Sequence, residues 1–205
     1  MITIDKAEHP IANFIFAHGA GAGKDSDFMQ DMSARLVGLG ITVIRFDFPY
    51  MQTIAETGKK RPPDRAPVLL DYFKRVIGDV TRTLPLFIGG KSMGGRMASL
   101  LLDEEDVAGG IVFGYPFHPP GKPEKLRTEH LQTLSTPLLI LQGERDTFGR
   151  KDEISEYSLS KQVNVRFLAD GDHSLKPRKA SGLSYDEHLN TAANLTAEFI
   201  SQHSR

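Results

Sequence analysis

Serine, aspartate and histidine occur in this sequence at positions where they could carry out nucleophilic catalysis. Ser92 lies in residues 90–94, Gly-Lys-Ser-Met-Gly, which fit the pattern Gly-x-Ser-x-Gly. An apolar run, residues 84–88, precedes this pattern, and a run with helical character, residues 95–102, follows it. A serine on a sharp strand-to-helix turn has a strained backbone and needs glycine on both sides, because larger side chains would clash. Such a turn exposes the hydroxyl above the end of the strand, so Ser92 is the candidate nucleophile.

A serine hydroxyl is a weak nucleophile at neutral pH and needs a histidine base that a carboxylate orients. Two later segments, residues 137–142 and 163–168, are expected to be strands, and the first of them is mainly apolar. Asp146 follows the first of these strands, and His173 follows the second. The chain order serine, aspartate, histidine, with each residue just past a strand, predicts a catalytic triad of Ser92, Asp146 and His173.

Other carboxylates near these strand ends leave alternatives for the orienting acid. Glu144 could replace Asp146 in this role. Asp170 or Asp172 could instead pair with His173. We favour Asp146, because the other carboxylates lie too close in sequence to the strand end or to the histidine to reach its far nitrogen easily.

An acyl-transfer site also needs N–H donors for the oxygen that becomes negative in the transition state. The residue after the nucleophile, Met93, supplies one such backbone N–H. Residues 18–23, His-Gly-Ala-Gly-Ala-Gly, follow the apolar run 13–17, and their small side chains allow a close approach to a substrate oxygen. The sequence therefore predicts an oxyanion hole formed by the backbone N–H groups of Met93 and Ala20.

Aromatic and histidine side chains that follow the expected strands are candidates for the substrate pocket. They are His18, Tyr50, Tyr115, Phe117 and His118. For His18 we favour a structural role beneath the oxyanion loop over a catalytic one.

Basic residues in the segment after residue 117 permit two interpretations. His118, Lys122, Lys125 and Arg127 could form a cationic rim that receives an acidic substrate. Because the segment is rich in proline, we favour a solvated loop.

A phosphate-binding loop is the main rival interpretation of residues 18–25, His-Gly-Ala-Gly-Ala-Gly-Lys-Asp. The pattern G-x-x-x-x-G-K-[ST] requires glycine at the position of His18 and a Mg²⁺-binding hydroxyl at the position of Asp25. Both requirements are chemical necessities and both fail, so we do not expect nucleotide hydrolysis. No group of His, Asp and Glu residues has metal-ligand spacing, and we expect neither a metal nor another cofactor.

Short apolar runs alternate with helical patterns along the chain. We expect strands at 13–17, 41–46, 84–88, 108–113, 137–142 and 163–168, and helices at 28–37, 68–81, 95–102, 130–134 and 185–202. This alternation predicts the α/β class, as a three-layer α/β/α sandwich with a mostly parallel, doubly wound sheet. Ligands bind beyond the carboxyl ends of such strands, so the candidate residues should share one edge. Residues 52–67 are polar and should form a mobile loop, and residues 114–137 are too few for a cap domain.

The composition fits one globular domain over residues 1–205, with 40% hydrophobic and 25% charged residues. A net charge of −1 gives no general attraction for nucleic acid or for an acidic membrane. The absence of cysteine excludes disulfides, a thiol nucleophile and a cysteine-based zinc site. Residues 1–12 lack the apolar core of a signal peptide, and no apolar run could cross a bilayer, so we expect a cytoplasmic location.

Together these stretches resemble the α/β-hydrolases, and more closely the KANL3/Tex30-like hydrolase family, which is related in shape to dienelactone hydrolases. The matching stretches are Phe-Ala-His-Gly-Ala-Gly-Ala-Gly (16–23), Arg-Phe-Asp-Phe-Pro-Tyr (45–50), Gly-Gly-Lys-Ser-Met-Gly-Gly-Arg (89–96), Tyr-Pro-Phe-His-Pro-Pro-Gly-Lys-Pro (115–123), Lys-Leu-Arg (125–127), Gly-Glu-Arg-Asp (143–146) and Asp-His (172–173). The resemblance implies Ser92 as nucleophile, Asp146 as acid and His173 as base, but it implies no substrate.

We therefore expect a serine hydrolase that cleaves a small ester or related acyl substrate through an acyl-enzyme intermediate. A carboxylesterase is the favoured type, and a thioesterase or peptidase would use the same residues. A protein that keeps this fold as a non-enzymatic interaction module is the alternative from another class. The sequence indicates no oligomeric state.

Overall fold

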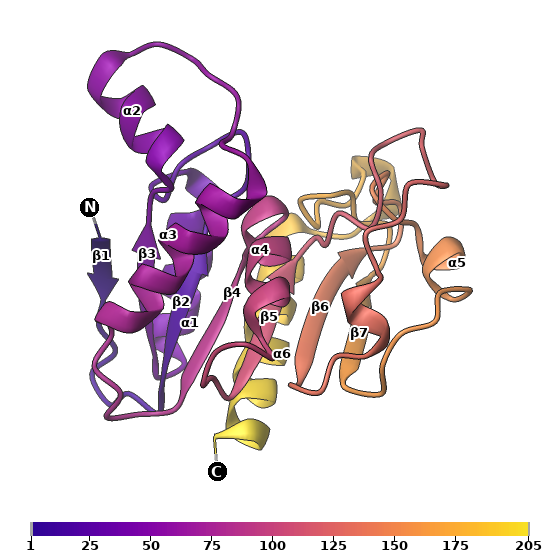
Figure 1. Ribbon diagram of the computed structural model, residues 1–205. Coiled ribbons are helices and arrows are strands. Elements are labelled where there is room, and N and C mark those ends of the chain that lie inside the picture. Colours follow the sequence, from indigo (N-terminus) through magenta and orange to yellow (C-terminus); the bar gives the residue numbers. More distant parts are fainter. Residues whose placement is uncertain (1, 205) are drawn as a thin grey trace.

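A computed structural model describes residues 2–204, which form a seven-stranded sheet between layers of helices (Figure 1). The strands are β1 (Ile2–Asp5), β2 (Ala12–Ala17), β3 (Ile41–Phe46), β4 (Leu86–Lys91), β5 (Gly109–Phe113), β6 (Leu138–Gly143) and β7 (Val163–Leu168). Their order across the sheet is β1-β3-β2-β4-β5-β6-β7. β1 is antiparallel to β3, and every other neighbouring pair is parallel.

Helices cover both faces of this sheet. They are α1 (Asp27–Gly38), α2 (Pro49–Thr57), α3 (Ala66–Asp79), α4 (Met93–Leu101), α5 (Lys151–Ile154) and α6 (Tyr185–His203), with short 3-10 helices η1 (His130–Gln132) and η2 (Lys179–Ser181). In Figure 1, α3 and α4 lie in front of the sheet and α1 and α6 lie behind it. The predicted three-layer sandwich with a mostly parallel sheet is confirmed.

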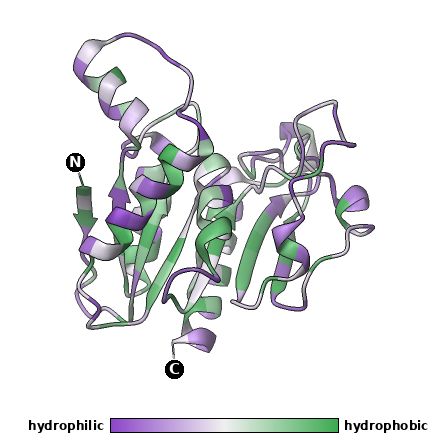
Figure 2. Cartoon of the chain, in the orientation of Figure 1, coloured by the Kyte–Doolittle hydropathy of each residue, from purple (hydrophilic) through white to green (hydrophobic). Residues whose placement is uncertain are grey.

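The two faces of the sheet bury separate apolar clusters, because successive side chains of a strand point to opposite faces. In β2, Phe14 and Phe16 face the cluster that α1 and α6 cover. Ile15 and Ala17 face the cluster that α3 and α4 cover. Figure 2 shows the inner strands as mainly hydrophobic segments between helices of mixed hydropathy. A strand that is buried on both faces needs such a continuous apolar run, which explains why the sequence revealed the inner strands.

The register of the parallel strands brings their carboxyl ends to one edge of the sheet. Ala17 at the end of β2 pairs with Gly90 in β4. Lys91 at the end of β4 pairs with Phe113 at the end of β5. The loops that follow β2, β4, β6 and β7 therefore lie beside one another, although they are separated by as many as 150 residues of chain.

Residues 52–67 are not the continuous mobile loop that the sequence predicts. α2 occupies 49–57 and α3 begins at Ala66, so that only residues 58–65 lie outside helices. Pro49 stands in the first turn of α2, and Gly58 ends the helix with a φ of 67° and an N–H bond to the carbonyl of Ile54 at 2.8 Å. Figure 1 shows α2 standing above the carboxyl edge of the sheet. The polar composition of this segment concealed its helix signals, a proline at the start and a glycine at the end.

Three short elements were not predicted: β1, α5 and η2. β1 has only four residues at the edge of the sheet, which is too short for a clear apolar run. Between β5 and β6, residues 114–137 hold only the 3-10 helix η1, so no cap covers the sheet edge. Within residues 2–204, no helix combines the length and the hydropathy needed to cross a membrane.

Candidate active site

Ser92 lies on a strained turn between the end of β4 and the first residue of α4. Its φ of 49° and ψ of −113° fall where residues other than glycine rarely lie. A Cβ atom on Gly90 would come within 2.4 Å of the carbonyl oxygen of Ala17, and one on Gly94 within 2.5 Å of the carbonyl oxygen of His18. The glycines of the Gly-x-Ser-x-Gly pattern are therefore needed for the close approach of β2 and its loop.

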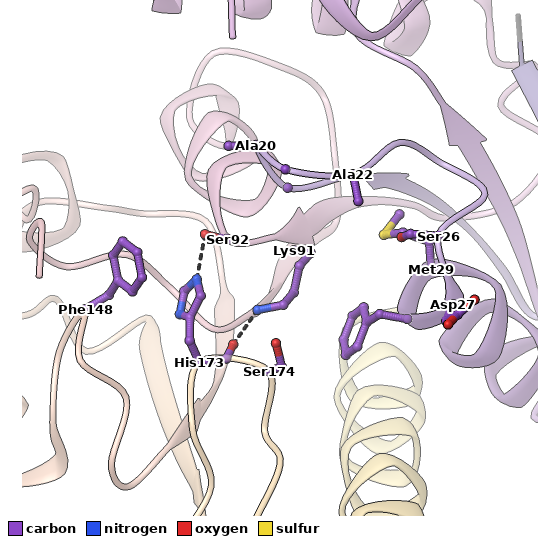
Figure 3. A pocket seen from close by; sticks show the side chains of 13 residues that line it. Ala20, Ala22, Ser26, Asp27, Met29, Lys91, Ser92, Phe148, His173 and Ser174 are labelled. Carbon is purple, nitrogen blue, oxygen red and sulfur yellow. Dashed lines mark hydrogen bonds between the residues drawn. The ribbon is translucent and has the colours of Figure 1, made fainter. Parts of the chain in front are cut away.

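Three side chains from three different loops form a hydrogen-bonded chain. Nε2 of His173 lies 2.8 Å from Oγ of Ser92 (Figure 3). Nδ1 of the same ring lies 2.7 Å from Oδ2 of Asp146. Because the carboxylate can only accept, Nδ1 carries the proton, and Nε2 is left to accept the proton of the serine hydroxyl. The structure thus brings together the three residues that the sequence predicted from their places after β4, β6 and β7.

Asp146 is completely buried, and it accepts hydrogen bonds from two further groups besides His173. The amide of Gln142 donates to Oδ2 at 2.8 Å, and the backbone N–H of Phe148 donates to Oδ1 at 2.8 Å. These donors satisfy a charge that would otherwise be costly to bury, and they fix the direction in which the carboxylate points.

The alternative acids have other partners. Glu144 pairs with Lys151 at 2.8 Å and accepts from the backbone N–H of Asp170. Asp170 itself bonds to the guanidinium of Arg178. Asp172 accepts the N–H groups of the turn that follows His173, at 2.8 and 3.0 Å. The geometry therefore favours Asp146.

The environment of His173 favours its neutral form. Burial lowers the pKa of His173 below its usual value of 6.5, the bond to Asp146 opposes this shift, and the charge of Lys91 adds to it. The ring of Phe148 stacks on the imidazole, with 4.2 Å between ring centroids and 28° between ring planes. A neutral imidazole is the form that can accept a proton from Ser92.

Lys91 is the last residue of β4, and its side chain lies beside His173 (Figure 3). Its ammonium donates a hydrogen bond to the main-chain carbonyl oxygen of His173 (Figure 3). Burial lowers the pKa of Lys91 from 10.5 to about 8, and the nearby Asp146 and Asp172 oppose this shift. This hydrogen bond connects the end of β4 to the loop that carries His173.

Two backbone N–H groups stand free near the serine. Neither Met93 nor Ala20 donates a hydrogen bond to any acceptor among residues 2–204. Met93 is the first residue of α4, where the helix leaves N–H groups unpaired and carries partial positive charge. The phenol of Tyr50 donates to the carbonyl oxygens of Gly19 and Ala20, at 3.2 and 3.0 Å. These bonds hold the loop by its carbonyls and leave its N–H groups available.

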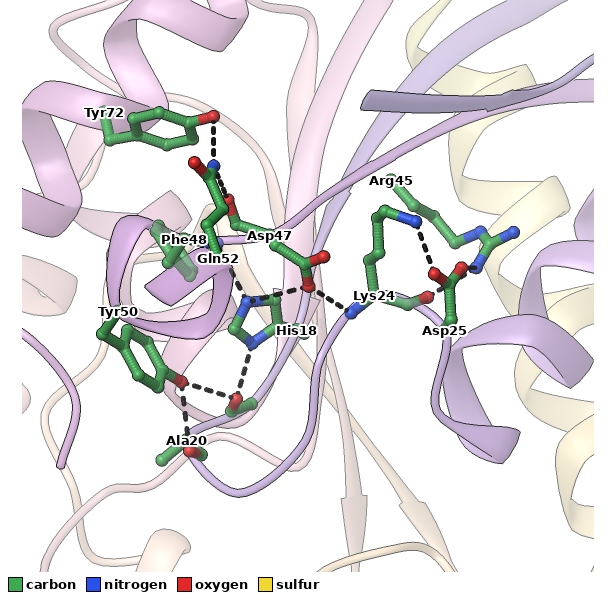
Figure 4. A network of polar contacts seen from close by, with 11 residues as sticks. His18, Ala20, Lys24, Asp25, Arg45, Asp47, Phe48, Tyr50, Gln52 and Tyr72 are labelled. Atoms are coloured by element: carbon green, nitrogen blue, oxygen red, sulfur yellow. Dashed lines mark hydrogen bonds and ion pairs between the residues drawn. The ribbon is translucent and has the colours of Figure 1, made fainter. Parts of the chain in front are cut away.

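His18 supports the same loop through its imidazole ring (Figure 4). Its Nδ1 lies 2.7 Å from the carbonyl oxygen of Gly19, and its Nε2 accepts the N–H of Phe48 at 3.0 Å. The ring is completely buried, and burial lowers the pKa of His18, so it stays neutral beside Asp47 at 3.8 Å. The structure thus places His18 in the supporting position that we favoured.

Two cavities border Ser92. The first, of about 520 Å³, is lined by the loop 19–22, the start of α1, Lys91 and His173 (Figure 3). The second, of about 340 Å³, is lined by Met93, Met97, the start of α3 and two arginines, Arg96 and Arg127. Phe148 and Ala20 border both cavities. The first cavity is mainly apolar, and the second combines apolar walls with positive charge.

The five side chains that we expected in the substrate pocket line neither cavity. His18, Tyr50, Tyr115 and Phe117 are fully buried, and His118 is 2% exposed. The phenol of Tyr115 donates to the carbonyl of Arg127 at 2.8 Å, and the ring of Phe117 packs on that of Tyr115 at 4.7 Å. The chain turns inward after β5, at Gly114 with a φ of 69°, so these side chains support the cavity walls from within.

Three residues at the cavities were missed or undervalued in the sequence. Phe148 follows Asp146 by two positions, and Arg96 follows Ser92 by four, which places it on the same face of α4. Arg127 belongs to the segment that we expected to be a solvated loop. Residues 121–126 are indeed exposed, but Arg127 is partly buried and lines the second cavity.

No group of three or more His, Cys, Asp or Glu side chains within residues 2–204 is arranged to hold a metal ion. The geometry at Ser92 consists of an oriented acid–base pair and unpaired N–H donors. Such an arrangement is suited to nucleophilic attack on a carbonyl carbon.

Solved structures of other proteins share this arrangement of strands and helices. An alpha-beta serine hydrolase homologue from Coxiella burnetii is 16% identical with a TM-score of 0.73, over 96% of this chain and 89% of that one. A dienelactone hydrolase from Anabaena variabilis is 17% identical with a TM-score of 0.73, over 100% and 92%. A serine hydrolase without a lid from Xanthomonas campestris is 18% identical with a TM-score of 0.73, over 98% and 88%.

At these identities the likeness establishes the fold, and it confirms the predicted α/β-hydrolase fold without a cap. A family model described as an alpha/beta hydrolase domain matches residues 10–201 of the sequence. The chain therefore belongs to the alpha/beta hydrolase domain family.

Proposed function

We propose that this protein is a serine hydrolase that cleaves small carboxylic esters through a covalent acyl-enzyme. The observation that carries the proposal is the unbroken chain of hydrogen bonds from Asp146 to His173 to Ser92, at 2.7 and 2.8 Å, beside an open cavity. A serine on a strained turn that contacts a neutral, oriented imidazole has the properties of an activated nucleophile.

The reaction would begin when Nε2 of His173 takes the hydroxyl proton of Ser92. The serine oxygen then forms a bond to the carbonyl carbon of the ester, and the carbonyl oxygen becomes negative. The N–H groups of Met93 and Ala20 stabilise this oxyanion, and one such donor contributes about 3 to 4 kcal/mol to lowering the barrier. His173 returns the proton to the departing alkoxide, which leaves the acyl group on Ser92.

Water completes the cycle in a second step of the same kind. Nε2 of His173 takes a proton from water, and the resulting hydroxide attacks the acyl carbon. When the new tetrahedral intermediate collapses, Ser92 leaves with that proton and the acid is released. Asp146 stabilises the positive imidazole that forms twice in this cycle and holds its ring in place.

The proposal also covers the extent of the domain, its subfamily, its substrate and its location in the cell. We propose that residues 1–205 form a single hydrolase domain of the KANL3/Tex30-like kind, supported by the sequence stretches given above. The substrate would be a small acyl compound, and the protein would act in the cytoplasm.

Labelling with a fluorophosphonate probe tests the proposal directly. The probe reacts with activated serines, so we expect it to label the wild type and to fail with Ser92→Ala and His173→Ala. Ser174→Ala is the matched control, because Ser174 lines the same cavity and touches neither His173 Nε2 nor Asp146 in the hydrogen-bond network. A folded wild type that the probe does not label, or labelling that survives in Ser92→Ala, would overturn the proposal.

A further inference from the structure

Arg96 and Arg127 line the second cavity without a carboxylate partner. Within residues 2–204, neither guanidinium lies within 4.0 Å of a carboxylate oxygen. Among the described residues, the buried Nε of Arg96 has no hydrogen-bond partner. A buried donor without an acceptor is costly. Arg96 as a whole is only partly buried and lines the second cavity, so an anion in that cavity would face its guanidinium and offset part of this cost.

The two arginines are held where they repel each other. The backbone of Arg127 is fixed on both sides, because its N–H donates to Phe117 and its carbonyl accepts from the buried Tyr115, both at 2.8 Å. Arg96 follows Ser92 by one helical turn, and its N–H donates to the serine carbonyl at 2.9 Å. Burial and the charge of Arg96 both lower the pKa of Arg127. An anion between the two guanidinium groups would relieve this repulsion.

One carboxylate, that of Asp64, borders the second cavity among the residues that the structure describes. It lies 3.1 Å from the guanidinium of Arg61, which stands on the exposed segment before α3. Asp64 thus has its own cation and does not neutralise the pair. Its negative charge at the rim does disfavour a dianion, so the pair suits a group with a single charge.

The roles of the two cavities follow from the position of His173. This residue must give its proton to the leaving group, so the leaving oxygen has to stand beside its ring. His173 lines the first cavity and is not among the described residues that line the second. The leaving group therefore belongs to the first cavity, and the acyl chain extends past Met93 and Met97 into the second.

We propose that the acyl group of the substrate ends in a carboxylate, which Arg96 and Arg127 bind together. This inference rests on the proposed function, since it assigns the acyl side of the same site. The planar fork of a guanidinium matches the two oxygens of a carboxylate, and a volume of about 340 Å³ holds a short chain between that carboxylate and Ser92. The natural substrates would then be half-esters of short dicarboxylic acids.

Paired substrates test the preference. We would compare the p-nitrophenyl half-ester of glutaric acid, which carries a free carboxylate, with the neutral p-nitrophenyl pentanoate of the same chain length. The wild type should favour the half-ester in kcat/KM, and Arg96→Gln or Arg127→Gln should each lower that preference about 10- to 100-fold. Arg166→Gln is the control of equal charge change, because Arg166 is exposed on β7, outside both cavities. An unchanged preference in both cavity variants would overturn the inference.

A binding measurement separates this inference from the proposed catalysis. Ser92→Ala protein should bind monomethyl glutarate and not dimethyl glutarate in calorimetric titration, and adding Arg96→Gln or Arg127→Gln should abolish the binding. This result would support the anion site even if the fluorophosphonate test failed. Equal binding of the two esters, or binding of neither, would overturn the inference. Tighter binding of inorganic phosphate than of monomethyl glutarate would overturn the carboxylate assignment.

Discussion

The ammonium of Lys91 donates a hydrogen bond to the main-chain carbonyl oxygen of His173. This contact joins the residue before the candidate nucleophile to the residue that would act as its base. It also places a positive charge near an imidazole that gains positive charge during the proposed reaction. The lysine therefore positions the histidine loop and lowers the pKa of His173 at the same time.

Replacing Lys91 should separate these two effects. We expect Lys91→Met to lower kcat/KM about tenfold, because the histidine loop loses a charged hydrogen bond. The acid limb of the pH–rate profile should also move toward higher pH, because the removed charge no longer opposes protonation of His173. Lys176→Met is the matched control, since this lysine lies on the same loop but is exposed. An acid limb that does not move would refute the electrostatic role of Lys91.

The pH dependence of the wild type follows from the environment of His173. Burial holds the pKa of His173 below 6.5, and only the neutral ring can accept the serine proton. We expect kcat/KM for a neutral ester to rise with pH through an apparent pKa below 6.5 and to be constant from about pH 7. A stopped-flow or steady-state profile between pH 4.5 and 8.5 measures this. An apparent pKa above 7 would contradict the assignment of the base.

The identity of the orienting acid can be tested with two conservative substitutions. Asp146→Asn would leave Nδ1 of His173 facing an amide and favour the wrong tautomer, and we expect kcat to fall by a factor on the order of 10³ to 10⁴. Asp172→Asn is the control, because an amide oxygen can still accept the two N–H groups that Asp172 now accepts. A larger loss of kcat in the Asp172 variant than in the Asp146 variant would show that Asp172, and not Asp146, orients His173.

The convergence of Ser92, Asp146 and His173 could be predicted because it depends on topology alone. Each residue follows a strand of the parallel sheet, and parallel strands bring their carboxyl ends to one edge. The choice of Asp146 over Glu144 depended on side-chain direction, which only the packing of β6 and its loop determines.

The substrate pocket could not be predicted in this way. Tyr115 and Phe117 follow a strand as the catalytic candidates do, but Gly114 turns the chain inward and buries both rings. Aromatic side chains gain more from burial than from lining an open cavity, so their position after a strand is a poor guide to function. Arg96 had a usable signal, its spacing of four from Ser92 on one helix.

The strained turn that carries Ser92 leads to a prediction about stability. A methyl group on Gly94 would lie 2.5 Å from the carbonyl oxygen of His18, which is backbone and cannot move aside cheaply. We expect Gly94→Ala to lower the free energy of unfolding by about 1 to 3 kcal/mol, as overpacking does in cores. Urea denaturation measures this loss. Gly21→Ala is the control, because a Cβ at Gly21 meets nothing within 4 Å, and its unfolding should stay close to that of the wild type.

A substitution of Tyr50 can show whether this residue positions the loop at residues 19 and 20 or contacts the substrate. Its ring is fully buried, and its hydroxyl donates to the carbonyl oxygens of Gly19 and Ala20, so it acts on the substrate only through the loop that carries the Ala20 N–H. We expect Tyr50→Phe to lower kcat about tenfold with little change in KM, because the loop loses its anchor in the transition state while ground-state binding is kept.

A control and a second readout make this prediction decisive. Tyr72→Phe removes a partly buried phenol that contacts only the amide of Gln52 in the hydrogen-bond network, and it should leave kcat unchanged. The rate of fluorophosphonate labelling, which also develops charge on an oxygen in the oxyanion hole, should fall in Tyr50→Phe to the same degree as kcat. If Tyr50→Phe raises KM and leaves kcat and the labelling rate intact, the phenol contacts substrate directly and the loop needs no such anchor.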